Sequence, residues 1–190
     1  TNTMNSQEEL SSFQRDIALR FPVESVGMDY ATYAEENTKI RGKSFTFEDY
    51  SFQREIMNDL SENSSLIKIS QVGITEIYLR KAAIFAKRNG YTTVLYTLPD
   101  DNMLANVSQT RMKPLMTEKD SIFFTPGGLS RVGVYQIDQS YVYLSGMTES
   151  DATSVPGDFV MHDEFDLSDP DIIGQYPSRL QNSNFKLTHR

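Results

Sequence analysis

The chain has 190 residues, no cysteine and a formal net charge of −8, which suits one domain with a hydrophobic core and excludes a disulfide framework or a thiolate metal site. No run approaches the roughly 20 apolar residues of a membrane-spanning helix, and residues 1–20 lack the apolar stretch of a signal peptide. We therefore expect a cytoplasmic protein with no membrane partner, and the acidic balance does not by itself indicate binding to nucleic acid.

Residues 1–46 are predicted to form an N-terminal helical and linker region partly separate from a core domain over 47–190. An amphipathic helix is expected over 8–21, where Pro22 ends it. The charged stretch 30–43 is also expected to be helical, and then loose around Gly42. A second helix is expected over 47–60, since its apolar residues recur at helical spacing.

The most informative stretch follows a short apolar run, 65–69, that predicts a buried strand. It reads Lys68-Ile69-Ser70-Gln71-Val72-Gly73-Ile74-Thr75, and apolar residues over 75–89 then recur at helical spacing until Asn89-Gly90 stops the helix. Strand, loop and helix are the context of a phosphate-binding loop, in which backbone N–H groups at the helix start face an anion. An ordinary turn between strand and helix that contains a glycine is the alternative.

The loop is a variant of the usual pattern of glycine, four residues, glycine, lysine and serine or threonine. Aligned on Thr75, Gly73 takes the second glycine, Ile74 the lysine position and Lys68 the first glycine. The positive charge would therefore reach the phosphates from the start of the loop. Residues 70–75 are predicted to cradle the phosphates, and the Thr75 hydroxyl to face Mg²⁺.

A β-branched strand is expected over 92–98, and a helix over 100–116 with Asp100 as its N-cap. Arg111 on this helix has two interpretations, a catalytic arginine or a salt bridge at the helix end. Residues 121–146 alternate in the manner of antiparallel strands, with segments expected at 122–124, 133–137 and 141–144.

A second apolar strand, from Asp158, ends in the carboxylates of Asp163 and Glu164. In P-loop NTPases such a strand ends in an aspartate of the Mg²⁺ shell, and a glutamate after it can deprotonate the attacking water. We expect this strand beside that of the phosphate-binding loop. A solvated acidic turn is the alternative. A helix bearing Arg179 over 170–182 and a last strand over 184–188 complete the chain.

These elements predict an α/β fold of the P-loop NTPase (ASCE) type. It has a mainly parallel sheet with helices on both faces and an antiparallel β-meander added to it. Ligands of open α/β sheets bind at the carboxyl ends of the strands, where Lys68, Asp163 and Glu164 would meet.

Four segments together resemble the large terminase subunits of tailed bacteriophages, the ATP-driven motors of DNA packaging. Residues 50–53 are similar to the family's adenine-recognition segment, and Lys68 to Thr75 to its lysine-first Walker A loop. Residues 94–99 and 108–114 resemble the following strand and helix with an Arg-x-x-Pro signature. Residues 145–166 resemble the approach to Walker B.

The resemblance implies an ATPase that uses Mg²⁺ and drives double-stranded DNA into a procapsid, in the host cytoplasm. Its partners would be other large subunits in a ring, the portal protein, the small subunit and the DNA. Gln53 would read adenine, whereas the basic groups at 39–43, 80–81 and 87–88 are interpreted as solvated loops or helix faces. Any DNA contact is thus implied by the family alone.

The sequence also departs from the family. Ser70 and Gln71 stand where many members carry an arginine, so the catalytic positive charge would come from Lys68, Arg111, Arg179 or a neighbouring subunit. The chain stops about where the family's coupling motif would begin. The resemblance therefore implies most of an ATPase domain without the nuclease domain.

Two other functions remain open. The first is a metal-dependent hydrolase or nuclease built on the acidic cluster from Asp158 to Glu164, together with Asp166. His162, however, is expected on the opposite strand face from Asp163. The second is a non-catalytic P-loop module that serves assembly. A helicase is a further option within the ATPase class.

Overall fold

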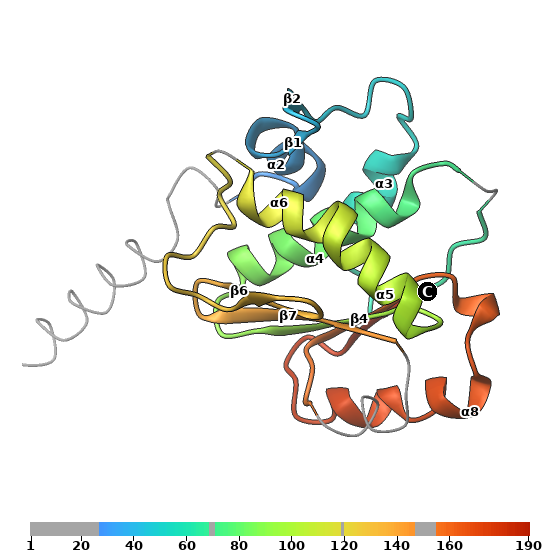
Figure 1. The fold of residues 1–190 in the computed structure, drawn as a ribbon. Coiled ribbons are helices and arrows are strands. Elements are labelled where there is room, and N and C mark those ends of the chain that lie inside the picture. The colour runs from blue at the N-terminus through green and yellow to red at the C-terminus, as the bar shows by residue number, and fades with distance from the viewer. Residues whose placement is uncertain (1–26, 69–70, 119, 147–154) are drawn as a thin grey trace, which may run out of the picture.

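The computed structural model describes residues 27–68, 71–118, 120–146 and 155–190. The helix expected over 8–21 lies outside these ranges. The described residues form an α/β fold with a seven-stranded mixed sheet, helices on both of its faces (Figure 1) and a separate short hairpin. No helix in the described ranges is long and apolar enough to cross a membrane.

The sheet has the strand order β3-β9-β8-β4-β7-β6-β5. Its first five strands are parallel, and β6 and β5 add to β7 in antiparallel pairing. The strands are β3 (Asn63–Ser64), β4 (Thr93–Thr97), β5 (Ser130–Arg131), β6 (Val134–Ile137), β7 (Ser140–Ser145), β8 (Phe159–His162) and β9 (Leu187–His189).

The position of β9 corrects one expectation. The strand that ends at Asp163 was expected beside the strand of the phosphate-binding loop, but β9 lies between β3 and β8 and pairs in parallel with both. The phosphate-binding strand is also displaced. β3 covers only Asn63–Ser64, although Leu66 N still donates to the carbonyl of Arg190 at 2.7 Å and so continues the ladder.

The helices lie mainly on one face of the sheet, with α8 on the other (Figure 1). They are α2 (Tyr30–Asn37), α3 (Gln53–Asn58), α4 (Ile74–Arg88), α5 (Asp101–Val107), α6 (Lys113–Thr117) and α8 (Pro170–Ile173). The 3₁₀ segments η3 (Phe165–Leu167) and η4 (Tyr176–Leu180) follow β8 and α8. The single helix expected over 170–182 is thus two short pieces.

Helix α4 is the centre of the core, because all of its side chains from Ile77 to Ala86 are buried. It begins after Gly73, which has the left-handed φ of 73°. A Cβ there would lie 3.2 Å from Gln53 Nε2. Glycine is therefore required both by its backbone conformation and by the close approach of α3.

The helix expected over 100–116 is observed as one continuous run with a π-helical middle, η2 (Ser108–Met112). Asp100 is its N-cap, as expected, and accepts from Met103 N at 2.8 Å. Pro114 has no N–H to donate, and the wider π turn that precedes it accommodates this loss.

Two other segments differ from expectation. Residues 39–44 form a hairpin of β1 (Lys39–Ile40) and β2 (Lys43–Ser44) in place of the end of a helix. Residues 122–124 form no strand, since this segment is a turn that buries Phe123 at 1% exposure. The antiparallel addition consists of β5, β6 and β7.

The two faces of the sheet carry separate apolar clusters. Leu95 and Val160 pack with Tyr176 and Leu180 on the η4 side, whereas their neighbours along the strands join the larger cluster around α4. Side chains alternate along β8, so His162 and Asp163 lie on opposite faces.

Candidate functional site

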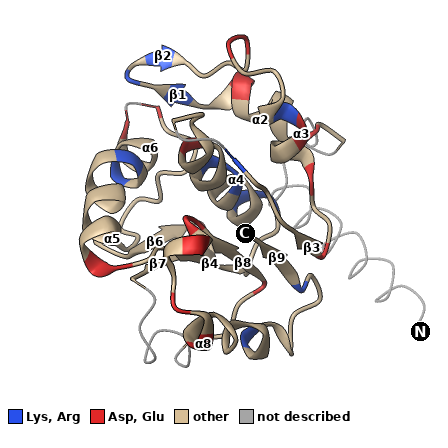
Figure 2. Ribbon diagram, turned by 90° about the vertical axis from the view of Figure 1, so that its right-hand side faces the viewer, with Lys and Arg blue, Asp and Glu red and all other residues tan. Residues whose placement is uncertain are grey.

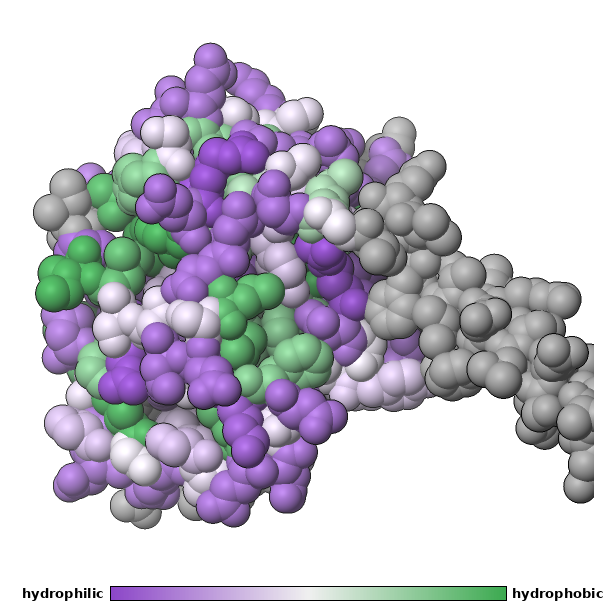
Figure 3. Space-filling model, turned by 180° about the vertical axis from the view of Figure 1, so that it is seen from behind, coloured by the Kyte–Doolittle hydropathy of each residue, from purple (hydrophilic) through white to green (hydrophobic). Residues whose placement is uncertain are grey.

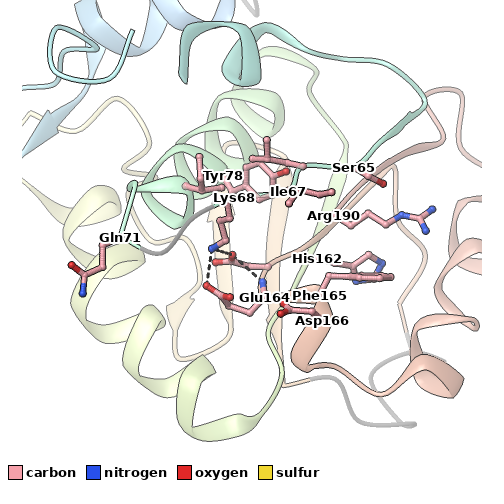
Figure 4. Close-up of a pocket in the computed structure, with 13 residues that line it drawn as sticks. Ser65, Ile67, Lys68, Gln71, Tyr78, His162, Glu164, Phe165, Asp166 and Arg190 are labelled. Atoms are coloured by element: carbon pink, nitrogen blue, oxygen red, sulfur yellow. Dashed lines mark hydrogen bonds and ion pairs between the residues drawn. The ribbon is translucent and has the colours of Figure 1, made fainter. Parts of the chain in front are cut away.

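Lys68 and the two carboxylates after β8 meet at the carboxyl edge of the sheet. Lys68 Nζ lies 2.6 Å from Glu164 Oε1 and 3.6 Å from Asp163 Oδ1. Figure 4 shows the side chains of Lys68 and Glu164 pointing toward one another. Burial alone would lower the pKa of Lys68, but its hydrogen bonds and charge interactions with Glu164 and Asp163 raise it. Residues 95 or more positions apart in the chain thus form one charged centre.

Asp163 is held by two hydroxyl donors. Thr75 Oγ1 donates to Asp163 Oδ2 at 2.7 Å, and Tyr96 OH donates to the same oxygen at 2.8 Å. Asp163 is 2% exposed. Burial, and then the charge of Asp163, raise the pKa of Tyr96 well above its usual value, so Tyr96 remains a hydrogen-bond donor at neutral pH.

Glu164 has a backbone conformation that is uncommon for a residue with a side chain. Its φ is 51°, in the left-handed region, which costs about 1–3 kcal/mol for a residue other than glycine. This conformation turns the chain from β8 into η3 and leaves Glu164 partly exposed beside Lys68. Strain of this kind is concentrated at functional sites.

Gln53, expected to read adenine, lies against the loop. It is 4% exposed, and its Nε2 donates to the carbonyl of Val72 at 2.5 Å. A surface glutamine is thereby excluded. Gln53 joins the first turn of α3 to the loop that precedes α4.

The remaining loop residues are placed differently. Ile74, at the usual lysine position, is 3% exposed and belongs to the core. Gln71 is exposed and has a φ of 64°, and its side chain points away from Lys68 (Figure 4). Gln71 and Ile74 nevertheless both line the cavity beside the charged centre. Ser70 lies outside the described residues.

A cavity of about 690 Å³ opens beside the charged centre. Lys68, Asp163 and Glu164 line it together with residues from the ends of β3, β8 and β9, among them Ser65, Ile67, His162, Phe165, Asp166 and Arg190. It therefore lies at the sheet edge where ligands of open α/β folds bind. Gln53, Gly73 and Thr75 are outside the described lining.

Arg111 lies near this centre but is paired with another residue. Its Nη1 is 3.3 Å from Glu76 Oε1, and its side chain is 41% exposed. Glu76 follows Thr75 in the first turn of α4 and is also held by Arg80, at 2.5 Å. The salt bridge, one of the two interpretations of Arg111, is thus present, and it holds Arg111 next to the start of α4.

Arg179 and Asp158 lie at the other end of β8. The carbonyl of Arg179 accepts from Gly157 N at 3.1 Å, and Asp158 accepts from Thr93 N and from the Ser183 hydroxyl. The structure does not bring either residue to Asp163. Among the described residues, no group of three or more histidine or carboxylate side chains could hold a metal ion.

The residues present nevertheless suit Mg²⁺ bound with a nucleotide. Mg²⁺ usually takes one or two protein oxygens and completes its shell with waters and substrate phosphates. The Thr75 hydroxyl and the Asp163 carboxylate are hydrogen-bonded to each other, so two such oxygens already converge. A cluster of protein ligands is not needed for this kind of site.

Two residues of the site region were missed in the sequence. Tyr96 on β4 binds Asp163, and no motif indicated it. Lys81 on α4 is fully buried. Its signal was visible, since it lies four residues after Ile77 on the apolar face of that helix.

The lowered pKa values of His162 and His189 predict that the folded state loses stability in acid. Burial, together with Arg190, lowers the pKa of His162 to about 4, and burial and Lys81 lower that of His189 to about 4. In the unfolded chain both histidines have pKa values near 6.5, so as the pH falls they bind protons in the unfolded state before they do in the folded state. The free energy of unfolding should therefore fall as pH drops from about 6.5 to about 4.

Urea unfolding at pH values between 7 and 4 measures this effect. His162→Gln and His189→Gln should each remove about one proton from the uptake on unfolding in that range. An unchanged pH dependence in both variants would show that the folded histidines titrate normally.

Comparison of the chain with protein-family models, with curated proteins and with solved structures found no match.

Proposed function

We propose that this chain is the ATPase domain of a phage terminase large subunit. It hydrolyses ATP with Mg²⁺ to drive double-stranded DNA into a procapsid, in the host cytoplasm. Its partners are further large subunits in a ring, the portal protein, the small subunit and the DNA. The family assignment rests on the four sequence segments, and the ATPase assignment also rests on the geometry of the site.

One observation carries the ATPase proposal. The two ends of the lysine-first loop, Lys68 and Thr75, both contact the acidic pair after β8, at 2.6 Å from Glu164 and 2.7 Å from Asp163. An ordinary turn with a glycine, or a solvated acidic turn, gives no reason for these contacts. A site for nucleotide and Mg²⁺ does give a reason, because it brings the loop lysine and the loop threonine beside the carboxylates that follow the second strand.

The strand order supports the same class. The strands that precede Lys68 and Glu164 are not neighbours, since β9 lies between β3 and β8. All three strands are parallel, so their carboxyl ends still share one edge of the sheet, where ligands of open α/β folds bind.

In the proposed mechanism, Lys68 and the loop backbone bind the phosphates, and Gln53 holds the loop through the Val72 carbonyl. Thr75 and Asp163 would hold Mg²⁺, and the bound ion would neutralise charge on the phosphates. Glu164 accepts a proton from the water that attacks the γ-phosphate. Because Glu164 is paired with Lys68, Lys68 must exchange this carboxylate for phosphate before Glu164 can act as the base.

The catalytic arginine in this proposal is Arg111 or an arginine of a neighbouring subunit. Arg111 is held one residue beyond Thr75 through Glu76, whereas Arg179 lies at the far end of β8. An arginine supplied by another subunit contributes about 10³–10⁵ in rate. The chain on its own is therefore expected to hydrolyse ATP slowly.

Thermal unfolding with Mg²⁺ and a slowly hydrolysed ATP analogue tests the nucleotide site. Ligand at about 100 times Kd should stabilise the chain by about 2.7 kcal/mol, or roughly 5–10 °C in Tm for a chain of this size. Lys68→Ala should lose most of this shift. Lys113→Ala is the matched control, because Lys113 is exposed on α6, and it should keep the shift.

The outcome separates the main alternatives. An equal shift in all three proteins would show that Lys68 does not bind the phosphates. A shift with Mg²⁺ alone that does not depend on nucleotide would favour the metal-dependent hydrolase. No shift in the wild-type chain would reject the nucleotide site.

A further inference from the structure

The sequence analysis identified three basic groups, at 80–81, 87–88 and 39–43. In the structure, the cations of the first group are buried, and those of the second contact other side chains. Arg80 and Lys81 are 2% and 0% exposed. Lys87 pairs with Asp138 at 2.7 Å, and the Arg88 guanidinium stacks on Tyr30. The expectation that these two groups form solvated helix faces was therefore wrong.

The third group, on the β1–β2 hairpin, is exposed. Lys39, Arg41 and Lys43 are all exposed, and Figure 2 shows positive charge on both strands of the hairpin. None of the three forms an ion pair within the described part of the chain. The chain has 26 carboxylates for 18 cations, so a group of exposed cations without ion pairs in the described ranges is unusual in this chain.

The hairpin is also held in a defined conformation. Its turn residues Arg41 and Gly42 both have positive φ, of 52° and 76°, which is the geometry of a tight two-residue hairpin. Arg80 Nη2 donates to the carbonyl of Lys39 at 2.8 Å, and its guanidinium stacks on Phe45, 4.5 Å from the ring centroid. A buried arginine thus anchors the hairpin to α4, which limits the ordering cost of binding.

We propose that the β1–β2 hairpin binds the phosphate backbone of double-stranded DNA through Lys39, Arg41 and Lys43. Duplex DNA carries about one negative charge per 1.7 Å of its axis. The register pairs Ile40 with Lys43, so Lys39 and Lys43 project from opposite faces of the hairpin, with Arg41 at the turn, and phosphates along one duplex lie within reach of each. The hairpin exposes no large apolar side chain. The aromatic anchors common in protein hot spots and the apolar face of interfacial helices are therefore absent from the hairpin, which favours nucleic acid as the partner.

This inference rests on the proposed function for the choice of duplex DNA, but not on the nucleotide site. Arg80 connects the hairpin to the nucleotide site, because it binds both the Lys39 carbonyl and Glu76. Glu76 directly follows Thr75 in the chain. Glu118 approaches the turn at Gly42. Glu118 and Asp120 also line a small pocket together with Lys39, and two carboxylates cannot neutralise three cations.

Fluorescence anisotropy with a labelled duplex of about 30 bp tests the proposal, without nucleotide and over a series of salt concentrations. The triple variant Lys39→Gln, Arg41→Gln, Lys43→Gln should bind about tenfold or more weakly at 0.1 M salt. Its plot of log K against log salt should lose about 2.7 in slope, from three contacts of about 0.9 each. The control variant Lys113→Gln, Arg131→Gln, Lys186→Gln removes the same three charges from other exposed positions, and should bind like the wild type.

Equal losses in both triple variants would overturn the proposal, because they would show an effect of net charge alone. Absence of duplex binding by the wild-type chain at 50 mM salt would also overturn it. So would a hairpin-dependent affinity for a poly-glutamate peptide, or for vesicles containing phosphatidylserine, as strong as that for DNA. Since the Lys68→Ala thermal shift tests the nucleotide site separately, failure of one proposal leaves the other standing.

Discussion

Glu164→Gln should reduce ATP hydrolysis by about 10²–10⁴-fold, the usual contribution of a general base, while nucleotide binding is retained. Glutamine has nearly the shape of glutamate but cannot accept the proton of the attacking water. The substitution also removes the charge that pairs with Lys68 at 2.6 Å. Lys68 is then free for phosphate, so the ATP analogue should stabilise this variant at least as much as the wild type.

Single-turnover hydrolysis with radiolabelled ATP is the suitable measurement, because it detects the slow rate expected without a neighbouring subunit. Asp166→Asn is the matched control. Asp166 is an exposed carboxylate two residues further along that lines the same cavity, and its loss should leave the rate nearly unchanged. Normal hydrolysis by Glu164→Gln would show that Glu164 is not the base. Nucleotide binding without hydrolysis in the wild type, even at high protein concentration, would favour the non-catalytic assembly module.

The local parts of the fold were predictable because their signals are local. The strand that became β4, helix α4 and the Asp100 cap each depend on residues close together in the sequence, and the structure has them within a few residues of the expected bounds. Lys68 and Asp163 were also identified from their own segments. The contact between those segments follows from a general rule, since the carboxyl ends of parallel strands share one edge.

The parts that were missed depend on pairing between distant segments. β9 has three residues and inserts between β3 and β8, and its composition does not reveal its neighbours. β3 is partly exposed and polar at Asn63–Ser64, so hydrophobic patterning placed the strand further along, at 65–69. The β1–β2 hairpin has a turn signal at Arg41-Gly42, but flanking strands of two residues are too short for a periodic pattern.

Lys81→Met should destabilise the fold by about 3 kcal/mol or more, because it removes hydrogen bonds between a charged donor and buried acceptors. The ammonium of Lys81 donates to the carbonyls of Ile56 and Asp59, at the end of α3, and approaches His189 Nδ1 at 3.3 Å on β9. Since His189 Nε2 lies 3.0 Å from the Ser61 carbonyl, Nε2 carries the proton and Nδ1 accepts. All three N–H donors of Lys81 are therefore used.

A buried cation also has a desolvation cost, which methionine would remove. Burial lowers the pKa of Lys81 to about 8, so the residue stays charged at neutral pH although burial disfavours its charge. The balance still favours lysine. Each acceptor left without a partner costs about 1–3 kcal/mol, and methionine cannot donate to any of the three.

Urea unfolding at pH 7 measures this destabilisation. If Lys81→Met does not fold, His189→Leu and His189→Gln test the same contact with smaller changes. Leucine removes the acceptor for Lys81 and the donor to Ser61, whereas the glutamine amide can replace both, so the leucine variant should be the less stable. Equal stability of the wild type and all variants would show that Lys81 does not hold these elements together. A loss of stability would instead show that Lys81 holds α3, α4 and β9 together. Gln53 lies on α3 and Thr75 on α4, and β9 lies between β3 and β8, the strands that precede Lys68 and Glu164.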